Sequence, residues 1–192
     1  MKIQHAEFVI SAAAIRQFPN TLLPEVAFAG KSNVGKSSLM NTLLARKALV
    51  KTSATPGKTR QVNFFRINER WHFVDLPGYG FAKAPKETRE TWEALVGGYL
   101  AQREPLRGVV MIVDIRHTPG ELDQHTKHWL EQQELPFIVV ANKADKLSRG
   151  QMAAHLRAVE DALELSEPPL AFSAHTGLGK AELWRWIQAR LA

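Results

Sequence analysis

The 192-residue sequence contains no cysteine. This absence excludes a disulfide framework and a thiolate metal site, and it suits a reducing compartment. No apolar run approaches the roughly 20 residues that a membrane-spanning helix needs. The run Phe8–Ile15 follows Glu7 and ends at Arg16, whereas a signal peptide has a basic start, a longer apolar stretch and a cleavage site. We therefore expect a cytoplasmic protein without membrane association, in which this run is a local element packed on the domain.

Internal repeats, low-complexity tracts and interdomain linkers are also absent. Hydrophobic residues make up 45% of the chain and charged residues 23%, which is typical of a soluble globular protein. A chain of this length buries one full core and is too short for two. We therefore predict one domain, residues 25–192, preceded by an N-terminal extension, residues 1–24, that packs on it. Nothing in the sequence indicates a stable oligomer.

Positive charge is concentrated in one part of the chain, Arg46–Arg89, which we call the basic segment. The net charge is +6, and the basic segment alone holds ten Lys or Arg residues against three acidic residues, a surplus of seven. The rest holds fifteen basic and sixteen acidic residues, a balance of −1 that brings the sum to +6. Such a patch attracts polyanions such as RNA, but a solvated basic loop has the same composition. Charge alone leaves both interpretations open.

Short apolar runs alternate with longer amphipathic stretches, a pattern that predicts an α/β fold. The expected strands are Val26–Ala29, Val62–Ile67, Trp71–Val74, Val109–Val113, Phe137–Ala141 and Leu170–Phe172. The expected helices are Lys36–Ala45, Lys86–Arg103, Glu121–Gln133, Arg149–Glu164 and Lys180–Ala189. The second and third strands are joined by a tight Asn-Glu-Arg connection, which indicates a hairpin. We therefore predict a mixed, mostly parallel six-stranded sheet with helices on both faces and one antiparallel pair at an edge.

Residues 30–37 match the pattern G-x-x-x-x-G-K-[ST] and form a predicted P-loop. They come directly after a predicted strand and open a predicted helix, which is the context the motif requires. The backbone N–H groups of such a loop and the positive helix end bind phosphate oxygens. Lys36 can reach the β- and γ-phosphates, and the Ser37 hydroxyl can bind Mg²⁺. The motif therefore predicts a nucleotide triphosphate site.

A D-x-x-G motif, Asp75–Gly78, closes the second predicted strand after the P-loop. A carboxylate at the carboxyl end of a strand faces the ligand crevice of such a sheet. Asp75 can hold Mg²⁺ through water, and the N–H of Gly78 can meet the γ-phosphate without obstruction by a Cβ. Alone the pattern is a common turn, but after a P-loop it supports nucleotide binding.

A third motif, Asn142-Lys143-Ala144-Asp145, closes the predicted strand Phe137–Ala141. The carboxylate of Asp145 can accept hydrogen bonds from both N1–H and N2–H₂ of guanine. Adenine presents an acceptor at N1 and no amino group at C2, so this group rejects it. Asn142 can bond either the base or the P-loop, and the stem of Lys143 can cover the face of the ring. The motif predicts guanine specificity.

Two further segments complete the predicted site. Ser173 and Ala174 follow the last predicted strand, and their backbone N–H groups can meet the guanine oxygen. The loop Thr55–Arg60 lies between the first predicted helix and the second strand, where a GTPase places a threonine that binds Mg²⁺ only while the γ-phosphate is present. Thr59 is the predicted ligand, and Thr55 is the alternative.

Together these motifs predict a P-loop NTPase of the Ras-like G-domain type that binds GTP and GDP and hydrolyses GTP. The residues expected to act on the reacting phosphate are Lys36, Thr59 and Gly78. The expected Mg²⁺ ligands are Ser37, Thr59 and Asp75. The residues expected to contact the nucleotide or its metal are Gly30, Lys31, Ser32, Asn33, Val34, Gly35, Lys36, Ser37, Ser38, Gly57, Lys58, Thr59, Asp75, Leu76, Pro77, Gly78, Asn142, Lys143, Ala144, Asp145, Phe172, Ser173 and Ala174.

In order and spacing these motifs resemble those of the EngB/YihA family of ribosome-biogenesis GTPases, among the TrmE-Era-EngA-EngB-Septin-like P-loop GTPases. The similarity rests on AFAGKSNVGKSSLMNTLL, TSATPGKTRQVNFF, FVDLPGYGFAKAP, VDIRH (Val113–His117) and NKADKL, and runs from about Glu25 to the C-terminus. Residues 25–192 would thus be an EngB-type G domain. The resemblance implies a monomer that acts in large ribosomal subunit assembly, with the rRNA and proteins of that subunit or its precursor as partners. It also implies a need for the protein in normal cell division and septation, through ribosome supply.

The sequence departs from the Ras-like pattern directly after the D-x-x-G motif. Tyr79 stands where Ras-like enzymes carry a glutamine that positions the attacking water. Asn33 in the P-loop resembles the asparagine with which some related GTPases hold K⁺. We therefore expect slow intrinsic hydrolysis that depends on Mg²⁺ and responds to K⁺ or to a ribosomal partner.

Two other classes of function share part of this evidence. A nucleotide kinase would need a lid and an acceptor pocket, and the guanine motif argues against it. A GTP-dependent RNA-binding module with incidental turnover would carry the same motifs. Ribosomal subunits would stimulate hydrolysis by a switch, whereas such a module would bind them without stimulation.

Among the other polar clusters, His117, His125 and His128 with Asp123 are better explained as surface histidines than as a metal site. Asp114 is expected to make a structural hydrogen bond.

Overall fold

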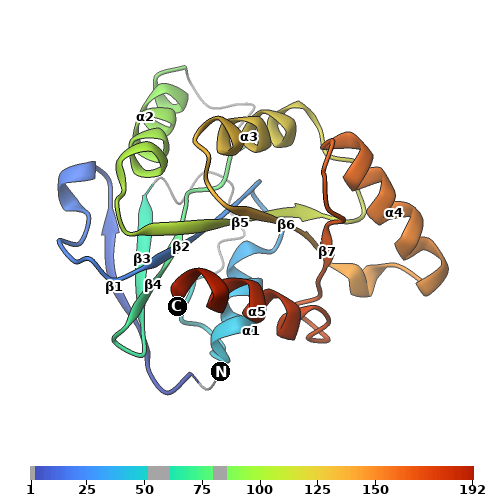
Figure 1. Ribbon diagram of the computed structural model, residues 1–192, viewed down its shortest axis with the longest axis horizontal. Helices are drawn as coiled ribbons and strands as arrows, with labels where there is room; N and C mark the ends of the chain where they lie inside the picture. The colour runs from blue at the N-terminus through green and yellow to red at the C-terminus, as the bar shows by residue number, and fades with distance from the viewer. Residues whose placement is uncertain (1–2, 52–60, 80–85) are drawn as a thin grey trace.

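The computed structural model describes residues 3–51, 61–79 and 86–192. Within them, seven strands form one sheet with five α-helices around it (Figure 1). The strands are β1 (Ala6–Ala12), β2 (Glu25–Gly30), β3 (Val62–Ile67), β4 (Trp71–Asp75), β5 (Leu106–Asp114), β6 (Phe137–Asn142) and β7 (Leu170–Ala171). The α-helices are α1 (Lys36–Leu44), α2 (Lys86–Gln102), α3 (Glu121–Gln132), α4 (Arg149–Ala162) and α5 (Lys180–Leu191). Short 3-10 turns lie at Ile15–Gln17 and Ala144–Lys146.

The sheet is mixed and mostly parallel, as the alternating pattern predicts. Its strand order is β1-β3-β4-β2-β5-β6-β7. β3 runs antiparallel to both of its neighbours, and every other neighbouring pair is parallel. All six residues of β2 are buried, and from Val26 to Gly30 they form the continuous run without polar side chains expected of a central parallel strand.

The number of strands and the position of the hairpin differ from the prediction. β1 pairs with β3 from Ala6↔Ile67 to Ala12↔Val62, so the sheet has one strand more than predicted and the β3–β4 hairpin is not at its edge. The register shifts between Phe8 and Ile10. A bulge changes which side chains face the core. The N-terminal run therefore lacks strict alternation, and the element expected to pack on the domain includes an edge strand of its sheet.

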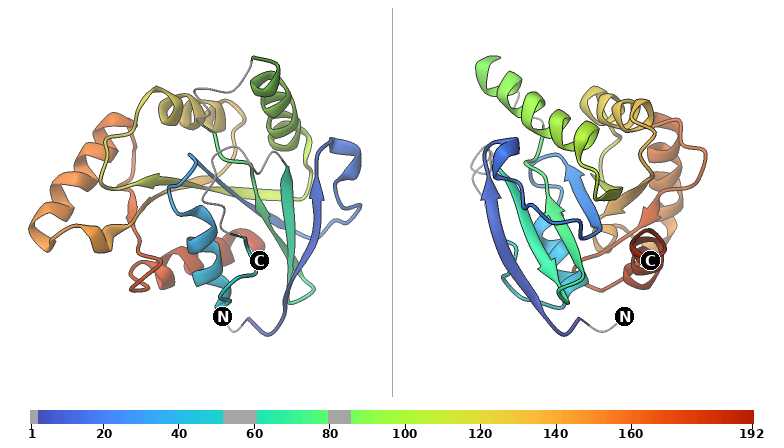
Figure 2. Two further views of the ribbon diagram at one scale, coloured as in Figure 1. Left: turned by 180° about the vertical axis from the view of Figure 1, so that it is seen from behind. Right: turned by 60° about the vertical axis from the view of Figure 1, so that its left-hand side comes forward.

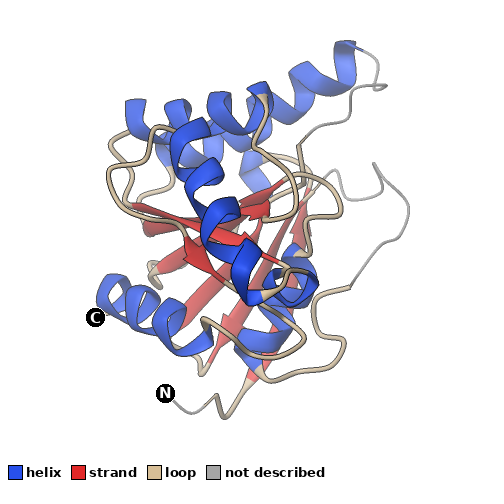
Figure 3. Cartoon of the chain, turned by 90° about the vertical axis from the view of Figure 1, so that its right-hand side faces the viewer, coloured by secondary structure: helices blue, strands red, loops and turns tan. Residues whose placement is uncertain are grey.

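The helices cover both faces of the sheet (Figures 1 and 2). One buried cluster joins the sheet to α2, α3 and α4, and a second joins its other face to α1 and α5. Figure 3 shows the sheet between these helical layers. Each helix ends within two residues of its predicted end. No helix in the described ranges has both the length and the apolar character needed to cross a bilayer.

Parallel pairing brings the carboxyl ends of β2, β4, β5, β6 and β7 to the same edge of the sheet. The loops that leave this edge carry the P-loop, the D-x-x-G motif and the guanine motif. In open α/β sheets, ligands bind at this edge. The fold therefore gathers these three motifs there, although the sequence separates the P-loop from the guanine motif by more than a hundred positions.

A buried polar cluster lies at the opposite end of β2. Glu25 is fully buried, and its carboxylate accepts hydrogen bonds from Arg103 at 2.6 Å and from the Tyr99 hydroxyl at 2.9 Å. The His72 ring lies 3.3 Å away. Burial opposes ionisation, but the hydrogen bonds of His72, Arg103 and Tyr99 outweigh it and hold the pKa of Glu25 below its ordinary value. The cluster ties the last turn of α2 to the start of β2.

We predict that Arg103→Met lowers the free energy of unfolding by roughly 3 kcal/mol at pH 7, because it leaves the Glu25 carboxylate buried without its cationic partner. Since the pKa of Glu25 is lowered on folding, its charge stabilises the protein above the unfolded value near 4.5 and this contribution is lost as the pH falls further. The difference between wild type and variant in urea denaturation should therefore shrink in acid. The double variant Glu25→Gln/Arg103→Met should be less destabilised than Arg103→Met; equal losses would contradict this account.

Candidate functional site

The P-loop connects β2 to α1 through a tight turn at the carboxyl edge of the sheet. β2 ends at Gly30, and Gly35 precedes the first residue of α1. The φ angle of Gly35 is +94°, and a Cβ placed there would lie 2.5 Å from the Asn142 side-chain nitrogen. Both the left-handed backbone and the close approach require glycine at this position. The turn leads directly into the first turn of α1, whose free backbone N–H groups can bind an anion.

The guanine motif is bonded directly to the P-loop. The side-chain nitrogen of Asn142 donates to the Val34 carbonyl at 2.9 Å, and Lys143 Nζ donates to the Asn33 carbonyl at 2.6 Å. Of the two roles predicted for Asn142, the structure shows the contact with the P-loop. The other side-chain atom of Asn142, Oδ1, is buried and makes no hydrogen bond within the described chain. A polar atom left in this state is typical of a site that takes a ligand.

Asp75 lies beside the first turn of α1. Its position at the end of β4 is set by the parallel register with β2, in which it pairs with Phe28. The carboxylate is buried, contacts Lys36 Nζ through Oδ1 and lies 3.4 Å from the Asn63 amide nitrogen through Oδ2. The register thus places a buried carboxylate next to Lys36, the P-loop residue predicted to act on the β- and γ-phosphates.

This donor set fits Mg²⁺. Asp75 offers carboxylate oxygens and Ser37 a hydroxyl oxygen, the hard ligands that Mg²⁺ prefers. Across the described ranges, no three His, Asp or Glu side chains converge on a common point. The arrangement therefore fits an ion that completes its coordination with phosphate oxygens and water rather than one held in a cage of protein ligands.

The D-x-x-G motif is joined to the P-loop through the backbone of Tyr79. Tyr79 N donates to the Gly30 carbonyl at 3.3 Å, and Ser32 N donates to the Tyr79 carbonyl at 3.2 Å. A Cβ on Gly78 would lie 3.2 Å from both Ser32 N and Ser32 Oγ, so a larger residue would push the two segments apart. The side chain of Tyr79 is buried, and its hydroxyl donates to Asp123 on α3 at 3.1 Å.

The segment after β7 forms a hydrogen bond with the side chain of Asp145. The Ser173 hydroxyl donates to Asp145 Oδ1 at 2.7 Å, and this bond is the main cause of the lowered pKa of Asp145. The carboxylate is therefore ionised and oriented, as a group that accepts two hydrogen bonds from one base edge must be. The Ser173 N–H donates to the Leu178 carbonyl at 3.1 Å, which leaves the Ala174 N–H as the candidate for the guanine oxygen. Thr42 on α1 donates to the Ala174 carbonyl at 3.0 Å.

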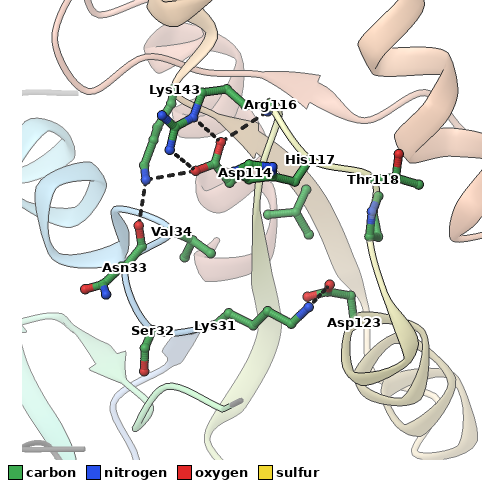
Figure 4. A pocket seen from close by; sticks show the side chains of 12 residues that line it. Lys31, Ser32, Asn33, Val34, Asp114, Arg116, His117, Thr118, Asp123 and Lys143 are labelled. Carbon is green, nitrogen blue, oxygen red and sulfur yellow. Dashed lines mark hydrogen bonds and ion pairs between the residues drawn. The ribbon is translucent and has the colours of Figure 1, made fainter. Parts of the chain in front are cut away.

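A pocket of about 370 Å³ lies on the outer side of the P-loop, between it and the start of α3 (Figure 4). It is lined by Lys31, Ser32, Asn33, Val34, Val113, Asp114, Arg116, His117, Thr118, Pro119, Asp123 and Lys143. Charged side chains pair across it. Asp114 accepts from Arg116 and Lys143, and Asp123 accepts from Lys31 (Figure 4).

The pairing explains the roles of two carboxylates that the motifs leave undefined. Burial disfavours the charge of Asp114, but hydrogen bonds from Arg116 and Lys143 outweigh it and hold the pKa of Asp114 far below its ordinary value. Asp114 thus orients the lysine of the guanine motif, which agrees with the structural hydrogen bond expected of it. Asp123, considered above only as a partner for histidines, instead contacts Lys31 and Tyr79.

The first three predicted groups, the P-loop, Asp75–Gly78 and Asn142–Asp145, lie together at one edge with Phe172–Ala174 beside them. The predicted residues Gly57, Lys58 and Thr59, with the alternative Thr55, lie outside the described residues. The choice between Thr59 and Thr55 stays a prediction.

Comparison with known proteins agrees with this geometry. Residues 25–143 match the family model described as "50S ribosome-binding GTPase". "Probable GTP-binding protein EngB" of Syntrophomonas wolfei is 50% identical over 183 residues, which cover 95% of each chain. The chain belongs to the EngB family of GTP-binding proteins. Its EngB relative from Shouchella clausii is 49% identical over 97% of this chain and 96% of its own.

Solved structures support the same assignment. A crystal structure described as a probable GTP-binding protein engB has a TM-score of 0.72 and 25% sequence identity. The match covers 87% of this chain and 98% of that one. This EngB-family chain therefore has the P-loop GTPase fold predicted from its motifs, with a seventh strand added at the β1 edge.

We predict that Asp145→Asn lowers the affinity for GTP and GDP by about 100-fold, because the amide cannot accept both donors of the guanine edge. Titration calorimetry with GTP, GDP and ATP measures this directly. Asp161→Asn is the matched control, since Asp161 is an exposed carboxylate on α4, and it should leave both affinities unchanged. Equal binding of ATP and GTP by the wild type would refute the assignment of the base site.

Proposed function

We propose that this chain binds GTP and GDP at the carboxyl edge of the sheet and hydrolyses GTP to GDP and phosphate. The observation that carries the proposal is the set of direct contacts among the P-loop, the D-x-x-G motif and the guanine motif. These contacts hold phosphate-binding, metal-binding and base-binding groups around one crevice. Catalysis of phosphoryl transfer is mainly positioning and charge stabilisation, so a site held in this way suits the reaction.

Three groups would act on the reacting phosphate. Lys36 lies beside Asp75 and is placed to neutralise the β- and γ-phosphate oxygens. Mg²⁺, held by Ser37 and Asp75 and by Thr59 as predicted, would supply further charge neutralisation when bound. The N–H of Gly78 would meet the γ-phosphate, and its position is set by the backbone bonds between Tyr79 and the P-loop.

The direction of the Tyr79 side chain supports slow intrinsic hydrolysis. Its hydroxyl is buried and donates to Asp123 on α3. A glutamine in a Ras-like enzyme orients the attacking water from this position, and a buried phenol bonded to α3 does not. We infer that an added group orients the water, and that K⁺ held by Asn33 or a ribosomal partner supplies it.

The basic segment supports a switch that meets an RNA-rich surface. Its surplus of seven charges flanks the loops before β3 and after β4, which carry the predicted contacts with the γ-phosphate. The matching family model is that of 50S ribosome-binding GTPases. We therefore propose a nucleotide-dependent role in large ribosomal subunit assembly, with the need in cell division and septation following from ribosome supply. Cytoplasmic location and a monomeric state belong to the same proposal.

Exchange of K⁺ for Na⁺ should lower the turnover of GTP by about tenfold if Asn33 holds a cation near the phosphates. Asn33 is exposed at the turn of the P-loop with a φ angle of +69°. Single-turnover phosphate release at equal ionic strength measures the effect, and Asn33→Ala should remove the difference between the ions. Equal rates for the wild type in both ions would exclude this role.

Purified large ribosomal subunits should stimulate GTP hydrolysis, whereas small subunits should not. Lys47→Glu/Lys51→Glu reverses two exposed charges of the basic segment and should weaken binding by about tenfold at low salt. Arg149→Glu/Arg157→Glu is the matched control, because it makes the same change at exposed positions of α4. Co-sedimentation and phosphate release are measured together. Binding without stimulation would favour a GTP-dependent RNA-binding module with incidental turnover.

A further inference from the structure

Asp123 joins three segments through one carboxylate. It lies in the first turn of α3 and is 3% exposed. Its Oδ1 accepts from the Tyr79 hydroxyl at 3.1 Å, and its Oδ2 accepts from Lys31 Nζ at 2.5 Å. The N–H of Gly120, which caps the helix, donates to Oδ2 at 3.0 Å. α3, the P-loop and the residue after Gly78 therefore meet at this side chain.

Tyr79 is held through both its backbone and its side chain. Its backbone bonds the P-loop on both sides, to Gly30 and to Ser32. Its hydroxyl bonds Asp123, and burial and the carboxylate raise the pKa of Tyr79 well above its ordinary value. The hydroxyl is thus a permanent donor. Because Gly78 directly precedes Tyr79, the fixed position of Tyr79 limits where the Gly78 N–H can lie.

The charged groups around the outer pocket favour this structural role over a ligand site. Lys31 is paired with Asp123, and Asp114 is paired with Arg116 and Lys143. Each of these charges is already compensated by a neighbour, so a second ligand would have to break an existing pair. Lys31 instead connects the backbone turn of the P-loop to α3 (Figure 4).

We propose that Asp123 is a positioning residue that sets the ratio of GTP affinity to GDP affinity, by holding Tyr79 and Lys31 so that the Gly78 N–H keeps a fixed distance from the P-loop. The inference rests on the proposed function, in which this N–H meets the γ-phosphate. In the proposed function the P-loop itself would bind the α- and β-phosphates, and its bonds to Asn142 and Lys143 do not involve the Tyr79 hydroxyl. Loosening Tyr79 should therefore weaken GTP binding and leave GDP binding nearly unchanged.

The two tyrosines of the chain offer a matched pair of variants, because both lie in the same kind of environment. Tyr79→Phe and Tyr99→Phe each remove one buried hydroxyl that donates to a buried carboxylate, Asp123 in one case and Glu25 in the other. Tyr99 lies at the opposite end of the sheet from the P-loop. The two variants should lose a similar free energy of unfolding. A difference between their ratios of GTP to GDP affinity therefore comes from the place of the lost hydroxyl and not from a loss of stability.

The experiment measures the affinities of wild type and both variants for GDP and for a non-hydrolysable GTP analogue by titration calorimetry with Mg²⁺. Tyr79→Phe should lower the ratio of GTP-analogue to GDP affinity by about tenfold, the size expected for one hydrogen bond to a charged acceptor. Tyr99→Phe should keep the wild-type ratio. An unchanged ratio in Tyr79→Phe, or an equal fall in Tyr99→Phe, would overturn the inference and leave the proposed function intact. A wild type that binds neither nucleotide would overturn both.

Asp123→Asn gives a second measurement that does not depend on the tyrosine. It keeps the shape of the side chain and removes the charge that pairs with Lys31, so the ratio should fall as well. If both groups act through the one carboxylate, the double variant Tyr79→Phe/Asp123→Asn should lower the ratio no further than the stronger single variant. Additive losses would contradict a shared mechanism.

Discussion

The parallel pairing of β2 with β4 on one side and with β5 on the other places the P-loop and the D-x-x-G motif at the same edge of the sheet. Pairing of Phe28 with Asp75 places the carboxylate beside the first turn of α1, and pairing of Gly30 with Ile112 aligns the end of β5 with the P-loop. β6 continues the same alignment, so Asn142 reaches the P-loop carbonyl of Val34. A shift of one residue in any of these registers would turn the side chains to the other face.

Hydrogen bonds of polar side chains and backbone groups then fix the positions of the motif residues relative to the P-loop. Asn142 and Lys143 bond the P-loop from the end of β6, and Tyr79 bonds it from the segment after β4. Apolar packing is nondirectional, so the two core clusters alone would not orient these groups. At the far end of β2, Glu25 accepts hydrogen bonds from Tyr99 and Arg103 and so fixes the last turn of α2. Each buried carboxylate is bonded to a donor, which limits the cost of its burial.

The sequence predicts the P-loop, the D-x-x-G motif and the guanine motif because each is a short contiguous string whose chemistry needs particular residue types. Their place at one edge follows from the alternation of strands and helices. The contact between Lys31 and Asp123 spans 92 positions, and no local pattern marks a helical aspartate as its partner. β1 escapes prediction for a different reason, since the extra residue at its bulge removes the alternation by which a strand is recognised.

The same bulge affects how the molecule meets copies of itself. A straight edge strand exposes a row of unpaired N–H and C=O groups on which another chain can add a strand, and such addition begins aggregation. Here the outer strand β1 is bent between Phe8 and Ile10, and Glu7 on it is paired with Arg66. The opposite strand, β7, has only two residues. Neither end of the described sheet is a long regular template, so this chain can carry a seven-stranded sheet with little risk of edge-to-edge stacking.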